Sequence, residues 1–208
     1  MDNVEFLRRH PRLFHLAHAQ AWPDLQEHGL LSTAALVSRS SLTPEVREQV
    51  LTERRPEAVH LEVPDFESVV VRDQAPLNLA KLAGALTDGM TTQEWLSFLN
   101  SLVFLFPDRV TLETLYEKYK TEPAVVVELN ARSLVEAYGA LVRVSSINSG
   151  ATVYVAASRG RETFRGIRQF DNKRKVKEVA LTVDIPDLAS HVVSVERWEP
   201  DGTRTPLR

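Results

Sequence analysis

A glutamate on an apolar strand is the residue whose type and position best suit catalysis. Glu178 lies in the segment 176–183, where alternation turns it away from the face that carries Val179. A carboxylate on a mostly apolar strand is energetically unfavourable unless another group pairs with it or it has a functional role. Glu178 is therefore a candidate catalytic residue, and the alternative is an edge-strand glutamate paired with Lys177 or Arg174.

A basic segment precedes this glutamate. Between residues 159 and 177, eight cations stand against two anions, in a chain whose net charge is −3. A cationic patch on an acidic body is a candidate site for a polyanion, and the alternative is a solvated, partly mobile loop. Phe164 and Phe170 lie in the same segment, and cations combined with aromatic rings suit a single-stranded nucleic acid. The candidate substrate-binding residues here are Arg159, Arg161, Phe164, Arg165 and Arg168.

The remaining residue types narrow the chemistry. The chain has no cysteine, which excludes disulfides, cysteine-ligated zinc and cysteine nucleophiles. It contains no GxGxxG, P-loop, GxSxG or HExxH motif. His15 and His18 would point to opposite faces of a strand, so we expect no metal site. A serine triad stays open, although no serine stands in a recognisable nucleophile context.

The sequence also indicates where in the cell the protein is expected to be found. No segment approaches the length of about 18 apolar residues that a transmembrane helix needs. The first residues show no apolar core followed by a cleavage site, so we expect no secretory signal. Together with the absence of cysteine, this predicts a cytoplasmic protein that does not enter a membrane.

These residues must be positioned by a chain that we expect to form a single domain over residues 1–208. Capping residues predict short helices after Ser32, Thr43, Thr91 and Asn130. Further helices are expected over 77–86 and 111–119, and strands over 59–63, 68–71, 124–129, 141–144, 176–183 and 191–198. The elements do not alternate as regular βαβ units, which predicts an α+β fold with mostly antiparallel pairing.

Two N-terminal runs resemble the opening of DarT-type DNA ADP-ribosyltransferases. They are residues 13–18, Leu-Phe-His-Leu-Ala-His, and residues 28–30, His-Gly-Leu. In that group a His-x-Thr-His strand precedes a helix ending in His-Gly-Leu, and the first histidine and the turn hold NAD. The resemblance implies NAD contacts from His15, Ala17, His18, Gly29 and Leu30, although Ala17 stands where the family has threonine. The alternative is a core strand with one satisfied histidine.

The pair Arg54-Arg55 resembles the arginine pair of the same family. The segment 72–77, Arg-Asp-Gln-Ala-Pro-Leu, resembles its later segment ending in Asp-Tyr-Val-Pro-Phe, but lacks the aromatic residues. The resemblance gives Arg55 the role of serving the cofactor phosphates and catalysis, with Arg54 as the alternative. A guanidinium suits this role because it grips phosphate oxygens through two parallel donors. The alternative is that both arginines only lie at the exposed C-terminal end of a helix, where the helix dipole favours cations.

The segment 177–183, followed by Ile185-Pro186, resembles the strand that carries the catalytic glutamate in those transferases. Loss of nicotinamide from NAD leaves an oxocarbenium-like ribose carbon. The resemblance implies that Glu178 stabilises that charge and helps to deprotonate the incoming nucleophile. In ADP-ribosyltransferases the loop before this glutamate presents the acceptor, so the basic segment implies a nucleic acid acceptor, with single-stranded DNA favoured.

Three further patches resemble an uncharacterised bacterial family over residues 10 to 197. They are 95–104, 147–152 and 159–164. This resemblance implies a common fold and supplies no activity. Asn100 lies in the first patch and is a further candidate substrate-binding residue, or it closes a turn.

Together the resemblances imply an NAD-dependent ADP-ribosyltransferase with a split antiparallel sheet and short flanking helices. They imply a role in a toxin–antitoxin system or phage defence, with an antitoxin or ADP-ribosyl hydrolase as partner. One alternative is a non-catalytic nucleotide-binding or nucleic-acid-binding module on the same fold. Another is an enzyme of this fold that transfers phosphate from RNA ends to NAD or acts on a free nucleotide.

Overall fold

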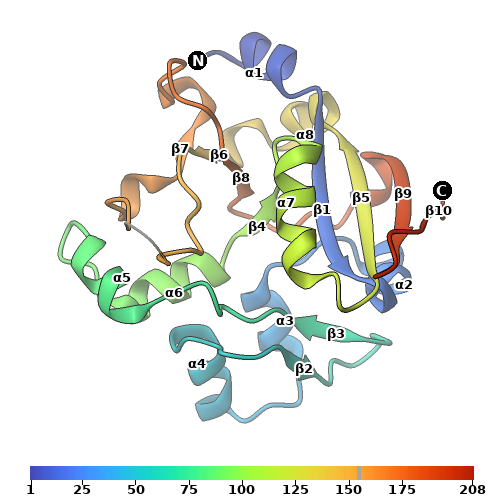
Figure 1. Ribbon diagram of the computed structural model, residues 1–208, viewed down its shortest axis with the longest axis horizontal. Helices are drawn as coiled ribbons and strands as arrows, with labels where there is room; N and C mark the ends of the chain where they lie inside the picture. The colour runs from blue at the N-terminus through green and yellow to red at the C-terminus, as the bar shows by residue number, and fades with distance from the viewer. Residues whose placement is uncertain (154–155) are drawn as a thin grey trace.

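The chain folds around two four-stranded antiparallel sheets (Figure 1). They are seen in a computed structural model that describes residues 1–153 and 156–208. The first sheet has the order β1 (Arg12–His18), β5 (Ala124–Asn130), β9 (Val192–Trp198) and β10 (Arg204–Pro206). The second has the order β4 (Val103–Leu105), β8 (Glu178–Leu181), β6 (Val142–Ser145) and β7 (Arg165–Gly166). A separate hairpin pairs β2 (Val59–Leu61) with β3 (Val69–Val71).

Short helices flank these sheets, and most begin at a capping side chain. They are α1 (Asn3–Arg9), α2 (Trp22–His28), α3 (Thr33–Arg39), α4 (Pro44–Thr52), α5 (Leu79–Ala85), α6 (Thr92–Asn100), α7 (Arg109–Tyr119) and α8 (Ala131–Tyr138). Thr91 and Glu94 form the expected capping box of α6. Ser32, Thr43 and Asn130 cap α3, α4 and α8 through their side chains, as the sequence predicts. No helix in the described part of the chain is long and apolar enough to cross a membrane.

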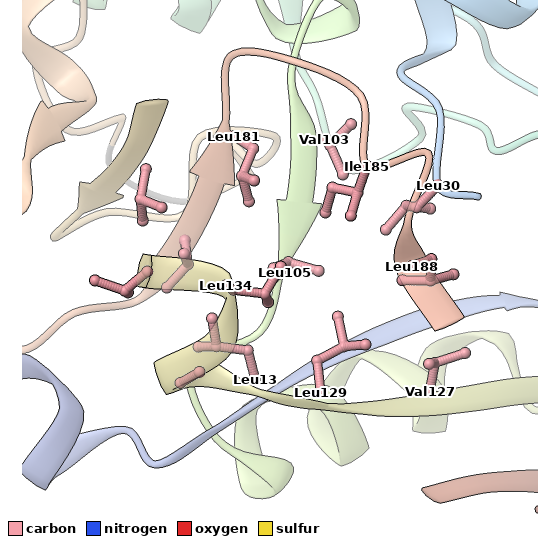
Figure 2. Packing of buried hydrophobic residues seen from close by; sticks show 14 of the residues in the cluster. Leu13, Leu30, Val103, Leu105, Val127, Leu129, Leu134, Leu181, Ile185 and Leu188 are labelled. Atoms are coloured by element: carbon pink, nitrogen blue, oxygen red, sulfur yellow. The ribbon is translucent and has the colours of Figure 1, made fainter. Parts of the chain in front are cut away.

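The main core lies between the two sheets. Figure 2 shows Val103, Leu105 and Leu181 of one sheet facing Leu13 and Leu129 of the other. Alternation explains this arrangement, because every second residue of a strand points to the same face. Val179 and Leu181, which the alternation places on the same face, are fully buried here. The opposite face of the strand therefore carries Glu178.

The two sheets meet along a seam between β1 and β4. The N–H of Phe14 donates to the carbonyl of Phe106 at 3.0 Å, and the N–H of Phe106 returns a bond to Phe14 at 2.7 Å. The strand β8 lies beside β4 on the far side of this seam. A mixed α+β fold with antiparallel sheets is therefore observed, as the sequence predicts.

Several boundaries differ from the expectations. β8 covers Glu178–Leu181 rather than 176–183, and α6 continues to Asn100 instead of ending before it. α7 starts earlier than residue 111 because the Asp108 side chain accepts from the N–H of Thr111 at 2.7 Å and caps the helix. α1 and β10 were not expected from the sequence. Asp2 caps α1, and its one buried residue is Phe6, a weak periodic signal for so short a helix.

Candidate active site

A cavity of about 310 Å³ lies beside β1, where the turn after α2, the end of β3 and the strand β4 approach one another. It brings together five residues that the sequence nominated for cofactor binding. These are His15, Ala17, His18, Gly29 and Leu30. They come from a strand and from a turn more than ten residues further along the chain, so the fold has gathered separate segments around one space.

His15 is held in a defined protonation state. Its Nδ1 lies 3.0 Å from the carbonyl oxygen of Phe104. Burial, helped by the charge of Arg72, lowers the pKa of His15 to about 4, against the raising effect of the hydrogen bond to Phe104. The ring is therefore neutral at pH 7. Because a carbonyl can only accept, Nδ1 carries the proton, and Nε2 keeps a lone pair that can accept from a ligand hydroxyl.

The turn at Gly29 is fixed against the chain that follows β8. Gly29 has φ +77°, and an added Cβ would lie 2.2 Å from the carbonyl oxygen of Ile185. Leu30 and Ile185 exchange backbone hydrogen bonds of 3.0 and 2.8 Å, and the N–H of Ser32 donates to Oδ1 of Asp184 at 2.7 Å. Only glycine fits this combination of positive φ and close approach. The turn is thus a rigid wall of the cavity.

The other two residues of the nominated strand make weaker polar contacts. His18 accepts from the N–H of Gln20 at 3.4 Å and lies 3.9 Å from a carboxylate oxygen of Glu122. Ala17 contributes only its methyl group, since it lacks the hydroxyl of the family's threonine. Of the β1 residues that line the cavity, His15 is therefore the one best placed to make a polar contact with a ligand.

Arg55 and Asn100 are brought together away from this cavity. The guanidinium of Arg55 donates to the carbonyls of Val50 at 2.6 Å and Arg72 at 3.1 Å, and to Oδ1 of Asn100 at 3.1 Å. Burial lowers the pKa of Arg55 to about 10. Asn100 in turn donates to the carbonyl of Leu51 at 2.8 Å. Both side chains tie the end of α4 to α6, and neither lines the cavity.

Arg54 also points elsewhere, and a different arginine lines the cavity. Arg54 donates to the carbonyl of Ala75 at 3.0 Å. Arg72, the residue directly after β3, is part of the cavity wall. Arg72 belongs to the segment Arg-Asp-Gln-Ala-Pro-Leu, but it was not predicted to be a site residue. The available signal was a cation at the end of a valine-rich strand.

Glu178 sits at the start of β8, next to the strand that carries Phe104. Its Oε1 accepts from the N–H of Ser149 at 3.0 Å. Its Oε2 is buried and has no hydrogen-bond partner among the described residues. Burial raises the pKa of Glu178 to about 7, against the lowering effect of the Ser149 contact and of the charge of Arg159. Glu178 does not itself line the 310 Å³ cavity.

Arg159 supports the loop that contacts Glu178. It is only 3% exposed. Its guanidinium donates to the carbonyls of Ser149 at 2.8 Å, Ala157 at 3.0 Å and Ala151 at 3.3 Å. Burial lowers its pKa. Arg159 therefore fixes the backbone whose N–H meets Glu178.

A second cavity, of about 360 Å³, lies on the other side of β8. Its wall includes Ser145, which pairs with Glu178 across β6 and β8, and it also includes Arg159, Arg165 and Arg174. The strand β8 lies between β4, which contributes Val103 and Phe104 to the first cavity, and β6, which contributes Ser145 to the second.

The basic segment exposes most of its cationic side chains to solvent and buries its two phenylalanine rings. Seven of its eight cations are exposed, which are Arg161, Arg165, Arg168, Lys173, Arg174, Lys175 and Lys177. Arg165 lies 3.6 Å from Glu162, Arg161 lies 4.0 Å from Glu94, and Lys175 lies 3.8 Å from Asp108, so these three are partly neutralised. Phe164 and Phe170 are 6% and 5% exposed. Phe164 packs edge-on against Phe104 at 5.7 Å. The two buried rings are therefore not placed to stack on bases, whereas the cationic side chains form an exposed surface.

A serine, a histidine and an aspartate meet elsewhere in the fold. Nδ1 of His191 lies 2.8 Å from Oγ of Ser133, and Nε2 lies 3.3 Å from Oδ2 of Asp187. Ser133, however, donates its hydroxyl to the carbonyl of Asn130 at 3.0 Å, within the N-terminal cap of α8. His191 is only 4% exposed. This cluster ties β9 to α8 and does not present an activated nucleophile. No group of three or more His, Asp or Glu residues among the described ones is placed to hold a metal ion.

The chain is an α+β protein with two antiparallel sheets, a cavity at their seam and a buried carboxylate on a central strand. The chain belongs to the family of unknown function DUF7002, whose model matches residues 11–192. A search of curated proteins found no match.

Proposed function

We propose that the chain is an NAD-dependent ADP-ribosyltransferase built on a split-sheet core of the ADP-ribosyltransferase type. One observation carries the proposal. The five residues chosen for their likeness to an NAD-binding strand and turn, from His15 to Leu30, line a single cavity of about 310 Å³. Its walls are largely apolar, which suits stacked rings, and few polar groups converge on it, as in most cofactor sites.

The reaction assigns a task to Glu178. The bond between nicotinamide and C1′ of the ribose breaks, and nicotinamide leaves with the bonding electrons. The acceptor then attacks C1′ and loses a proton, which Glu178 accepts. A pKa of about 7 suits a general base at neutral pH. In this proposal Nε2 of His15 accepts a hydrogen bond from a ribose hydroxyl and fixes the sugar.

The acceptor in this proposal is a nucleic acid, with single-stranded DNA favoured. The support is the exposed cationic surface of residues 161–177, which ends at Glu178. Cations that contact phosphates give a binding affinity that falls steeply with salt. A cytoplasmic toxin or phage-defence effector, controlled by an antitoxin or an ADP-ribosyl hydrolase, is the biological role that fits this activity.

The test is incubation of the purified protein with labelled NAD and separate pools of single-stranded DNA, RNA and protein. Transfer of label to the DNA pool is expected from the parent chain and not from Glu178→Ala. Glu136→Ala is the matched control, because it removes an exposed helical glutamate on α8. Absence of both transfer and nicotinamide release, in a folded parent chain, would overturn the proposal.

A second candidate function is a non-catalytic nucleotide-binding module. Two observations favour it, namely that Glu178 does not line the cavity and that Ala17 offers no hydroxyl. It predicts that NAD or a related nucleotide binds without release of nicotinamide. The same experiment, with binding measured alongside turnover, therefore separates the two.

A further inference from the structure

Phe66 is a lining residue of the 310 Å³ cavity that comes from the loop between β2 and β3. Its ring stacks on the imidazole of His28, with the two centroids 4.0 Å apart and the planes 24° from parallel. His28 is not among the lining residues that the structure describes. The face of Phe66 that His28 covers is therefore not the part of this residue that meets the cavity. The opposite face is a flat apolar surface, of the kind on which a planar ring stacks.

His28 also holds the backbone of the same loop. Its Nε2 lies 2.8 Å from the carbonyl oxygen of Asp65, the residue directly before Phe66. Because a carbonyl can only accept, Nε2 carries the proton of this hydrogen bond. One side chain at the end of α2 thus contacts both the ring of Phe66 and the backbone next to it.

Asp24 of α2 fixes the loop on the other side of Phe66. Its side chain is buried, with 6% exposed. Oδ1 accepts from the N–H of Glu67 at 2.8 Å, and Oδ2 accepts from the N–H of Ser68 at 2.9 Å. These are the two residues directly after Phe66. Asp24 lines the cavity, but both of its oxygens hold the loop. A ring that is fixed in this way loses little conformational entropy when a ligand binds.

The fixed ring is joined to the other walls of the cavity. Gly29 and Leu30 directly follow His28 and line the same space, as does His15. Backbone hydrogen bonds hold Leu30 to Ile185. The cavity therefore has an aromatic ring in one wall and a hydrogen-bond acceptor, the neutral His15, in another. A ligand that uses both needs a planar ring next to a hydroxyl group, and a nucleoside has this combination.

We propose that Phe66 is the ring-binding residue of this cavity, and that its face opposite His28 stacks on the planar heteroaromatic ring of a nucleotide. Asp24 and His28 are positioning residues, which act through the loop that carries Phe66. The inference rests on the proposed function, and within it assigns the group that holds a ring of the cofactor. The adenine ring and the nicotinamide ring share this chemistry, and the experiment distinguishes them.

The test measures the binding of NAD, adenosine monophosphate and nicotinamide mononucleotide to the full chain by calorimetry. Phe66→Leu keeps an apolar side chain and removes the ring, so it should weaken NAD binding by about 5-fold to 100-fold. Phe66→Tyr keeps the ring and should change the affinity less than about twofold. The mononucleotide that contains the stacked ring should weaken as NAD does, and the other should change less than about twofold. Phe98→Leu is the matched control, because Phe98 is also half-buried and lies on α6, outside the described lining of the cavity.

Asp24→Asn tests the positioning role. Asparagine keeps one acceptor oxygen and loses the other, so one of the two loop contacts is lost. We expect a smaller loss of affinity than in Phe66→Leu, for NAD and for the same mononucleotide. A purely structural role would instead weaken both mononucleotides alike.

Each other outcome has a defined meaning. Unchanged NAD affinity in Phe66→Leu would overturn the inference, and so would equal losses in Phe66→Leu and Phe66→Tyr. Equal weakening of both mononucleotides in Phe66→Leu would also overturn it, because a damaged cavity would explain that result. If the parent chain binds NAD through Phe66 but releases no nicotinamide, the proposed function fails and the inference stands. If the parent chain binds none of the three probes, both fail.

Discussion

The backbone N–H of Ser149 donates to Oε1 of Glu178 at 3.0 Å, while Oε2 of the same carboxyl group is buried without a partner among the described residues. One hydrogen bond does not replace the water that both oxygens would hold in the unfolded chain. The protonated form is favoured, and the pKa rises to about 7. Because only one of its two carboxyl oxygens has a hydrogen-bond partner among the described residues, Glu178 changes its charge near neutral pH.

Glu178→Gln should stabilise the fold at pH 8 and have little effect at pH 4. The pKa of about 7 lies above the ordinary value of 4.5. Stability from the protonated group is therefore complete below pH 4.5 and is lost as the pH rises through 7. We expect the variant to gain about 1–3 kcal/mol over the parent at pH 8, measured by urea unfolding. Glu136→Gln is the control. An equal difference at both pH values would contradict the burial of Oε2.

The rate of nicotinamide release should depend on the same ionisation. Below pH 6 most Glu178 is protonated and no longer has the negative charge that stabilises the developing positive charge on the ribose, so the rate should fall about tenfold per pH unit. Above pH 7 it should level off. Single-turnover rates between pH 5 and 9 would show this. A rate that does not change across this range, in a folded enzyme, would contradict this role of Glu178.

Gly29→Ala should destabilise the fold strongly. The added Cβ would meet the Ile185 carbonyl at 2.2 Å, and the residue has a positive φ of 77°. We expect a loss of about 2–4 kcal/mol in the free energy of unfolding. Gly89→Ala is the matched control, because Gly89 has φ +67° but nothing within 4 Å of its Cβ position. It should cost about 1 kcal/mol, from backbone strain alone. Similar losses in the two variants would show that the contact with Ile185 is absent.

His15 should remain neutral down to about pH 5, with its proton on Nδ1. Burial lowers its pKa to about 4, and the Phe104 carbonyl selects the tautomer. Nitrogen-15 NMR of the imidazole rings can report both properties. The exposed His60 serves as a comparison within the same spectrum. A His15 signal that titrates near pH 6.5, or that shows a protonated Nε2, would contradict the contact with Phe104.

The helix starts were predictable because capping is local chemistry. Thr43, Thr91 and Asn130 each accept from an N–H within three residues, so the sequence contains both partners. The shared face of Val179 and Leu181 followed from alternation in the same way, whereas the full burial of Ala180 on the opposite face did not. α1 was not predicted, although Asp2 caps it through the same local chemistry, because Phe6 is its one buried residue and the short helix shows no apolar periodicity.

The site was only partly predictable, for a related reason. His15 and Gly29 could be nominated because they belong to short motifs. The burial of Arg55 depends on carbonyls and on Asn100, which lies 45 residues away, and no local pattern encodes that pairing. Phe164 was nominated for a nucleic acid because of its cationic neighbours. Its contact with Phe104, 60 residues earlier, places it in the core instead.

The position of β8 has a consequence for the synthesis of the chain. β8 is inserted between β4 and β6, although it follows both in the sequence. The Gly29 turn likewise needs Ile185 to close it. A growing polypeptide therefore cannot complete the second sheet before β8 has been made, and it cannot close the Gly29 turn until residue 185 has left the ribosome. Products of translation that are truncated before that residue would lack the proposed activity. In a cell that makes this chain, only molecules extended past residue 185 would therefore be active.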